Sequence, residues 1–160
     1  MQKPLLDNID EMRQIDKENM LGQYIDASTH YSEAWRNAQK IKLDYPVPQN
    51  IILAGMGGSA IGGELLKDYT RETAQVSIEI SREYNLPAYA GKNTLVILAS
   101  YSGDTEETLS TFVDALKRRC MIYCVSSGGA LNKYAEKLNL PHLQVKSGMQ
   151  PRAAMPYMLL

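Results

Sequence analysis

The feature that most constrains the fold is a regular alternation of short apolar runs and helical stretches that begins near residue 50. The first run, Ile51-Ile-Leu-Ala, is typical of a strand buried on both faces. Similar runs follow at 76–80, 94–99, 121–125 and 142–145, with helical stretches around 58–69, 106–119 and 130–138 between them. Strands that alternate with helices imply crossover connections and a parallel sheet. We therefore expect an α/β fold, a three-layer sandwich with a five-stranded parallel sheet of flavodoxin-like type.

A helical segment precedes this alternation. Apolar side chains recur at helical spacing from Leu5 to Leu43, and the Tyr45-Pro-Val-Pro sequence then breaks the pattern. We expect residues 1–44 to form N-terminal helices that pack on a domain spanning residues 45–160.

The last ten residues also turn apolar and helix-like. Pro151 suits the first position of a helix, and Pro156 within such a helix would leave one carbonyl unpaired and bend it. A native chain rarely ends on an exposed Tyr-Met-Leu-Leu sequence. Either this end packs on the domain or the chain is one part of a longer protein, and we favour the second explanation.

The composition argues against several classes of protein. The net charge of −1 shows no basic stripe, so we expect no nucleic-acid partner. The N-terminus lacks the apolar core of a signal peptide, and no segment has the length of a membrane span. Cys120 and Cys124 are not joined by further cysteines, so buried thiols fit better than a zinc site. We expect a cytoplasmic protein with no membrane partner and no metal.

The first chemically informative loop follows the first predicted strand and reads Gly55-Met-Gly-Gly-Ser-Ala-Ile-Gly-Gly. Glycines in a strand-to-helix turn let the backbone approach a ligand closely. The free N–H groups of the helix N-terminus favour an anion, and Ser59 adds a hydroxyl. A tight turn needed only for packing is the simpler alternative for a single loop of this kind.

The same loop also fits a dinucleotide-binding pattern. Gly55, Gly57 and Ala60 match its G-x-G-x-x-A frame, and Glu79 follows where an acid would bind ribose. A nucleotide-binding oxidoreductase module is therefore an alternative from a different functional class.

A second loop favours phosphate over a dinucleotide. Ser100, Ser102 and Thr105 place hydroxyls within six residues at the start of another predicted helix. Hydroxyls together with backbone N–H groups form a directional phosphate cradle. Part of this run also fits an ordinary helix cap, with Asp104 or Thr105 as the cap and Glu107 in a capping box. Two loops at the carboxyl ends of strands one and three would face each other across the sheet's switch point.

Two further features lie at the same predicted edge. The Ser126-Ser-Gly-Gly loop follows the fourth strand and fits a simple turn at least as well as a ligand contact. Arg152 would lie in the opening turn of a helix, where a cation opposes the helix dipole. An anionic ligand or a salt bridge to a carboxylate would each account for it.

The ordered set GMGGSAIGG, SREYNLPAY, SYSGDTEETL, SSGG and PRAA resembles the bifunctional phosphoglucose/phosphomannose isomerase family. Members of that family consist of two sugar isomerase (SIS) domains. The resemblance covers residues 45–160 and implies that this chain is the N-terminal SIS half. It further implies interconversion of glucose 6-phosphate, and usually mannose 6-phosphate, with fructose 6-phosphate through a cis-enediolate, without a cofactor or metal.

The resemblance also implies roles for individual residues. The positions that match the family's phosphate-binding residues are Gly58, Ser59, Ser100, Ser102 and Thr105. Arg152 matches the catalytic arginine that stabilises the enediolate. The family's general-base glutamate and ring-opening histidine lie in the second SIS domain, so this chain alone would lack them. The family dimerises, which implies a homodimer for the full-length protein.

One residue departs from the family pattern. The second loop usually reads SGNT, and here Asp104 replaces the asparagine. A carboxylate there would repel phosphate unless it points away or caps a helix. A stand-alone SIS protein that senses a phosphosugar remains an alternative to the isomerase half.

Overall fold

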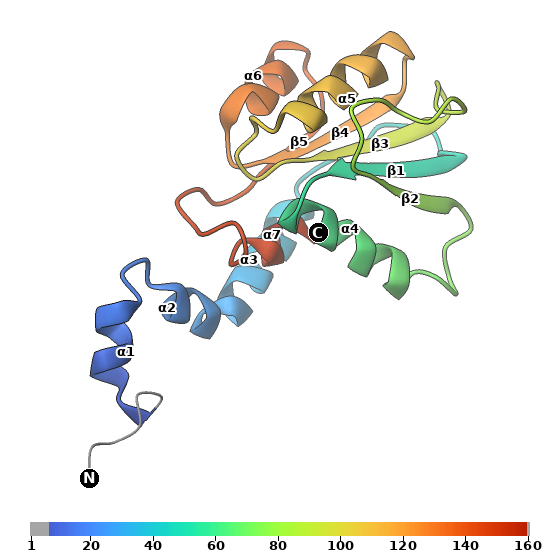
Figure 1. Cartoon of the computed structure of the whole chain (residues 1–160). Coiled ribbons are helices and arrows are strands. Elements are labelled where there is room, and N and C mark those ends of the chain that lie inside the picture. The colour runs from blue at the N-terminus through green and yellow to red at the C-terminus, as the bar shows by residue number, and fades with distance from the viewer. Residues whose placement is uncertain (1–6, 160) are drawn as a thin grey trace.

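The computed structural model describes residues 7–159 of the chain. Within this range one sheet has the strand order β2-β1-β3-β4-β5, and all neighbouring strands are parallel. The strands are β1 (Asn50–Gly55), β2 (Ser77–Ser81), β3 (Thr94–Ala99), β4 (Met121–Ser126) and β5 (His142–Gln144). The predicted five-stranded parallel sheet is confirmed (Figure 1).

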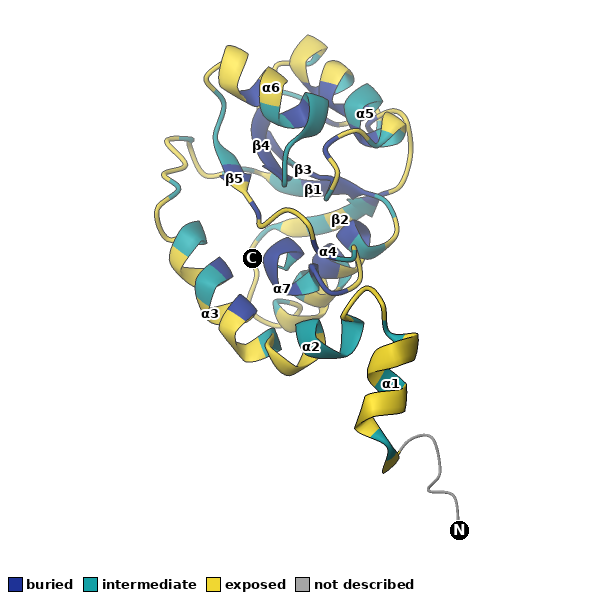
Figure 2. Ribbon diagram, turned by 90° about the vertical axis from the view of Figure 1, so that its left-hand side faces the viewer, coloured by how far each residue is buried: buried dark blue, intermediate teal, exposed yellow. Residues whose placement is uncertain are grey.

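Helices cover both faces of the sheet, which gives the predicted three layers (Figure 1). On one face lie α5 (Glu106–Lys117) and α6 (Gly129–Lys137). On the other lie α4 (Gly58–Tyr69), α3 (Ala27–Ala38) and the short α7 (Met155–Met158). Buried residues line the inner sides of these helices, as Figure 2 shows.

Two apolar clusters fill the spaces between the layers, because successive strand residues point to opposite faces. Ile52 and Val96 belong to the cluster under α5 and α6, where Phe112 and Leu131 join them. The opposite cluster contains Leu53 and Leu95 of the sheet and Tyr157 of α7. The continuous apolar runs in the sequence therefore reflect strands buried on both sides.

The N-terminal helices are shorter than the predicted helical segment. They are α1 (Ile9–Ile15), α2 (Met20–Ile25) and α3, and residues 1–6 of the predicted segment lie outside the described residues. The Asp16 carboxylate accepts hydrogen bonds from the N–H groups of Met20 and Leu21, each at 2.7 Å, and so separates α1 from α2. In Figure 2, α1 projects from the body, and it contains no buried residue.

The predicted helix ran to residue 44, but α3 ends at Ala38 and the chain from residue 41 to 48 is neither helix nor strand. The prolines at 46 and 48 keep Tyr45 and Val47 out of helical geometry, because a residue before proline avoids it, but they lie well beyond the end of α3. The Tyr45 hydroxyl donates to the Ile122 carbonyl at 2.9 Å and ties this segment to β4.

The prediction of a helix opening at Pro151 is wrong. Residues 151–154 form turns, and α7 begins only at Met155. Pro156 therefore lies in the first turn of α7, where its missing N–H costs no helical hydrogen bond. The helix lies close against α4 because Gly62 has no side chain: a Cβ there would come within 2.3 Å of the Met158 carbonyl oxygen.

No helix of residues 7–159 is both long and apolar enough to cross a membrane.

Candidate functional site

The loop after β1 leads into α4 through Gly57, whose backbone conformation is one that only a residue without a side chain adopts easily. Gly57 precedes α4 with a φ of 51°, in the region that favours glycine. Within the described part of the chain, no side chain caps the start of this helix. The N–H groups of Ser59 and Ala60 bond to the carbonyls of Met56 and Gly57, so the Gly58 N–H and the positive end of the helix dipole are what α4 offers to an anion at this edge of the sheet.

The loop after β3 is organised around the buried hydroxyl of Ser100. Its Oγ accepts a hydrogen bond from the Gly103 N–H at 3.0 Å and lies 2.8 Å from the Thr105 Oγ1. Ser100 is only 1% exposed, whereas Ser102 is exposed and its Oγ accepts from the Asp104 N–H at 3.2 Å. One serine thus shapes the loop and the other faces solvent.

Thr105 occupies the N-cap position of α5, but among the described residues it makes no side-chain cap bond. Its hydroxyl contacts Ser100 instead. Thr105 is thus the N-cap residue, one of the two positions that the helix-cap alternative allowed, but its side chain does not form the capping-box bond. As at α4, the first N–H groups of α5 are left without a side-chain cap.

A hydrogen bond joins the two loops. The Ser59 Oγ accepts from the Tyr101 N–H at 3.3 Å, and Tyr101 lies between the two candidate serines of the second loop. The structure therefore brings together Gly58 and Ser59 at the start of α4 with the hydroxyl-rich loop at the start of α5. This arrangement agrees with the switch point expected between β1 and β3.

Arg152 lies in the turn before α7 and is exposed. A Cβ placed on Gly58 would lie 3.6 Å from the carbonyl oxygen of the adjacent Pro151, so this turn borders the first loop. Within residues 7–159 no salt bridge involves Arg152. The explanation of this cation by a salt bridge therefore receives no support. The prediction that Arg152 lies in the opening turn of a helix is wrong, because α7 begins only at Met155.

The chain matches known proteins over this region. Over 107 residues, which are 67% of the chain, it is 44% identical to the bifunctional phosphoglucose/phosphomannose isomerase of Caldicellulosiruptor bescii. It is 33% identical over 111 residues to the protein of the same name from Thermoplasma acidophilum. The chain is a homologue of the bifunctional phosphoglucose/phosphomannose isomerases. It covers 32% and 34% of these two relatives, about a third of their length. No protein-family profile matches it.

Solved structures with low sequence identity share the fold. The C-terminal domain of glucosamine-fructose-6-phosphate aminotransferase from Francisella tularensis has a TM-score of 0.67 at 16% identity, covering 88% of this chain and 45% of that one. The Vibrio vulnificus NanR protein complexed with ManNAc-6P has a TM-score of 0.62 at 16% identity, covering 94% of this chain and 60% of that one. The parallel sheet of this isomerase homologue is thus the SIS fold.

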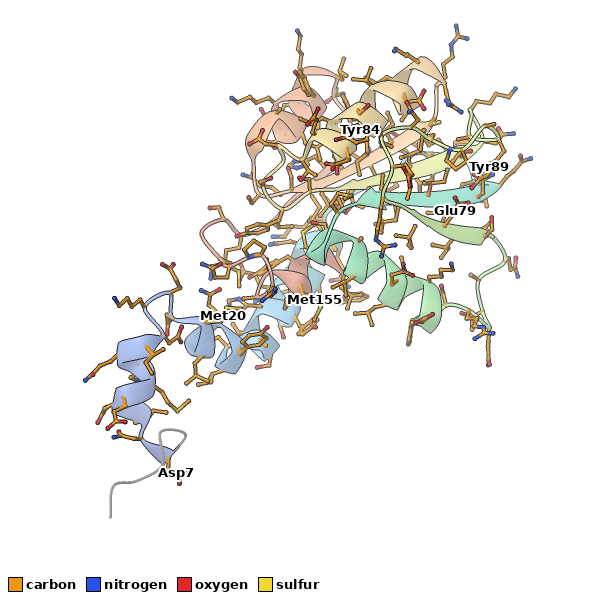
Figure 3. All side chains as sticks on the ribbon, in the orientation of Figure 1. Asp7, Met20, Glu79, Tyr84, Tyr89 and Met155 are labelled. Atoms are coloured by element: carbon orange, nitrogen blue, oxygen red, sulfur yellow. The ribbon has the colours of Figure 1, made fainter. Side chains whose placement is uncertain are left out.

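In this isomerase homologue Glu79, the acid that a dinucleotide would need, has another partner. Glu79 pairs with Ile52 inside β2, before the strand ends at Ser81. Its carboxylate accepts a hydrogen bond from the Tyr89 hydroxyl (Figure 3). Burial, followed by this contact with Glu79, raises the pKa of Tyr89 to about 12. The dinucleotide alternative therefore loses its ribose-binding acid.

The cysteine and histidine side chains of β4 and β5 show no sign of a metal site in the described part of the chain. Among the described residues, no three His, Cys, Asp or Glu side chains are placed to hold a metal ion. Burial raises the pKa of the Cys124 thiol to about 12, which makes it unreactive. The Nε2 of the neighbouring His142 lies 2.9 Å from the Ser126 Oγ, within hydrogen-bond distance.

The sequence reasoning missed one residue of this site, Tyr101. Its hydroxyl accepts from the Met149 N–H at 2.8 Å and donates to the Lys146 carbonyl at 3.1 Å. Together with its N–H bond to Ser59, Tyr101 links the first two loops to the segment that precedes Arg152. No pattern in the sequence indicated this role, since the position of a tyrosine between two serines does not determine which distant residues its side chain contacts.

Proposed function

We propose that this chain binds the phosphate of a sugar monophosphate at the edge formed by the loops after β1 and β3. The residues that would form the site are Gly58, Ser59, Ser102 and Thr105 around the phosphate, with the buried Ser100 holding the second loop in shape. The Ser59–Tyr101 hydrogen bond carries this proposal, because it holds two helix N-termini without side-chain caps next to each other. Backbone N–H groups, two helix dipoles and nearby hydroxyls all favour a phosphate dianion.

The reaction we propose for the full-length protein is the interconversion of glucose 6-phosphate, and mannose 6-phosphate, with fructose 6-phosphate. A general base removes the C2 proton of the open-chain aldose, and a cis-enediolate forms. The proton is then delivered to C1, and a second proton passes from the C2 hydroxyl to the C1 oxygen, which yields the ketose. Arg152 would stabilise the negative charge that develops on the enediolate oxygens.

The general base would come from outside this chain. The chain covers about a third of its relatives' length, which leaves room in the full-length protein for a second SIS domain after residues 45–160. We propose that this second domain supplies the base and the ring-opening group. We also propose that the complete enzyme works as a cytoplasmic homodimer, as its resemblance to the isomerase family implies.

A phosphosugar sensor is the second candidate. The observation in its favour is the likeness to the NanR protein complexed with ManNAc-6P. A sensor and an isomerase half would both bind a sugar phosphate, and they differ in turnover by the full-length protein.

The test combines binding and turnover. The 160-residue chain should bind fructose 6-phosphate without producing glucose 6-phosphate, whereas the full-length protein should catalyse the conversion. Turnover by the chain alone would contradict the assignment of the base to a second domain. Saturable binding of NADH that fructose 6-phosphate does not displace would instead favour the dinucleotide-binding alternative.

A further inference from the structure

The third loop, Ser126-Ser-Gly-Gly after β4, is not a further open anion site, because a carboxylate of the chain itself occupies the N-terminus of α6. The Asp104 Oδ1 accepts a hydrogen bond from the Ala130 N–H at 2.8 Å, in the first turn of α6. Asp104 is the residue that departs from the usual SGNT sequence. Its side chain thus caps α6 rather than α5, the helix that follows it in sequence.

The backbones of the second and third loops also meet closely. Gly103 and Gly129 have φ values of 78° and 70°. A Cβ on Gly103 would lie 1.9 Å from the Gly128 carbonyl oxygen, and one on Gly129 would lie 2.4 Å from that of Ser102. The Leu131 N–H donates to the Gly103 carbonyl at 2.9 Å. The loops therefore interlock where side chains would not fit.

We infer that Asp104 is a positioning residue for the phosphate site, an inference that rests on the proposed function. By capping α6, it fastens the loop that carries Ser102 and Thr105 to a second helix. Figure 1 shows α5 and α6 side by side on one face of the sheet, and this contact joins their N-terminal ends, which follow the carboxyl ends of β3 and β4. The uncapped N-terminus of α5 is thereby held in place for the ligand.

The carboxylate has an electrostatic cost as well as a geometric benefit. Asp104 precedes Glu106 and Glu107 in the first turn of α5, so three acids lie close to the proposed phosphate site. An asparagine at position 104 would also offer an oxygen to the Ala130 N–H, without the negative charge. Geometry and charge can therefore be separated by two substitutions at one position.

The experiment compares Asp104→Ala and Asp104→Asn with the unmodified chain, using fructose 6-phosphate and inorganic phosphate as probes. Asp104→Ala should weaken binding about fivefold to tenfold, an effect of the size expected when a helix cap is lost. Asp104→Asn should bind at least as tightly as the unmodified chain, and its advantage should grow as salt is lowered. Asp68→Ala, an exposed residue of α4, is the matched control.

Amide hydrogen exchange reports on the capping contact without any ligand. The Ala130 amide should exchange faster in Asp104→Ala than in the control, and it should stay protected in Asp104→Asn. Equal exchange in all variants would overturn the contact itself. If the unmodified chain binds but Asp104→Ala binds equally well, or Asp104→Asn is as weak as Asp104→Ala, the positioning role is wrong. If the unmodified chain binds neither probe, the proposed function fails and the inference fails with it.

Discussion

At the scale of single residues, the serines of the second loop have different tasks. Ser100 is buried and holds the Gly103 N–H and the Thr105 hydroxyl, so it shapes the loop. Ser102 is exposed and its hydroxyl can rotate toward a ligand. A direct contact with phosphate is therefore best tested at Ser102, where a substitution disturbs the fold least.

We expect Ser102→Ala to weaken binding of fructose 6-phosphate by about 1.5–3 kcal/mol, the value of one hydrogen bond to a charged group. Isothermal calorimetry on the chain measures this change. Ser32→Ala, on the exposed surface of α3, is the control and should leave the affinity unchanged. An unaltered dissociation constant for Ser102→Ala would remove this serine from the site.

Tyr157 is a buried residue of α7 that contacts two side chains of α3. Its hydroxyl donates to the Glu33 carboxylate at 2.8 Å and lies 3.1 Å from the His30 Nδ1. Because the single hydroxyl proton is used by Glu33, the His30 Nδ1 must carry the proton that it donates to Tyr157. This arrangement fixes α7 on α3.

Tyr157→Phe should destabilise the protein by about 1–3 kcal/mol, because the buried His30 Nδ1–H is left without its partner. Urea unfolding measures the difference. Tyr134→Phe is the matched control, since that tyrosine is 46% exposed and stacks on Phe112 through its ring. Equal stabilities of the two variants would show that the hydroxyl of Tyr157 contributes nothing.

At the scale of elements, α5 also holds the loop between β2 and β3. The Asp114 carboxylate accepts from the Leu86 N–H and from the Arg118 Nε, each at 2.9 Å, and the Arg118 Nη1 donates to the Pro87 carbonyl at 2.8 Å. Burial by itself would raise the pKa of Asp114. The hydrogen bonds from Arg118 and Leu86 outweigh burial and hold this pKa below its ordinary value.

Because the pKa of Asp114 is lower in the folded state than in the unfolded state, its ionised carboxylate stabilises the folded protein at pH values above the unfolded-state pKa, which is about 4. This contribution is lost as the pH falls through the folded-state pKa. Asp114→Asn should therefore be less stable than the unmodified chain at pH 7, and the gap should narrow below about pH 4. Urea unfolding at pH 7 and pH 3 measures both gaps, with Asp68→Asn as control. A gap that does not change with pH would contradict this account of Asp114.

The elements were largely predictable from the sequence, because apolar runs and glycine-rich turns report burial and backbone geometry directly. The strands lie within one residue of their predicted limits. The helix at Pro151 and the helix expected to reach residue 44 were not predicted correctly, since long-range contacts decide those ends. The cap formed by Asp104 links residues 26 positions apart, and no local pattern reveals it.

At the scale of the whole molecule, the residues proposed for the site come from three parts of the chain. Gly58 and Ser59 follow β1, Ser100 to Thr105 follow β3, and Arg152 precedes α7. Their order could be inferred from motifs, and their proximity from parallel topology. The turn that carries Arg152 could not be inferred, because it depends on the hydrogen bonds of Tyr101 and on the packing of α7.

Arg152→Ala in the full-length protein should lower kcat by about 10²–10³, the usual loss for a group that stabilises developing charge. The KM for fructose 6-phosphate should change little, because the phosphate is bound elsewhere. Steady-state kinetics measure both constants, with the exposed Arg71→Ala as control. Equal effects on kcat and on affinity would assign Arg152 to substrate binding instead.

We propose above all that this chain by itself contains a complete phosphate-binding site for a sugar phosphate. Calorimetric titration of the 160-residue chain with fructose 6-phosphate tests it most directly. We expect saturable binding of one ligand per chain, which inorganic phosphate weakens and Ser102→Ala reduces. A folded chain that shows no saturable binding of fructose 6-phosphate would contradict it.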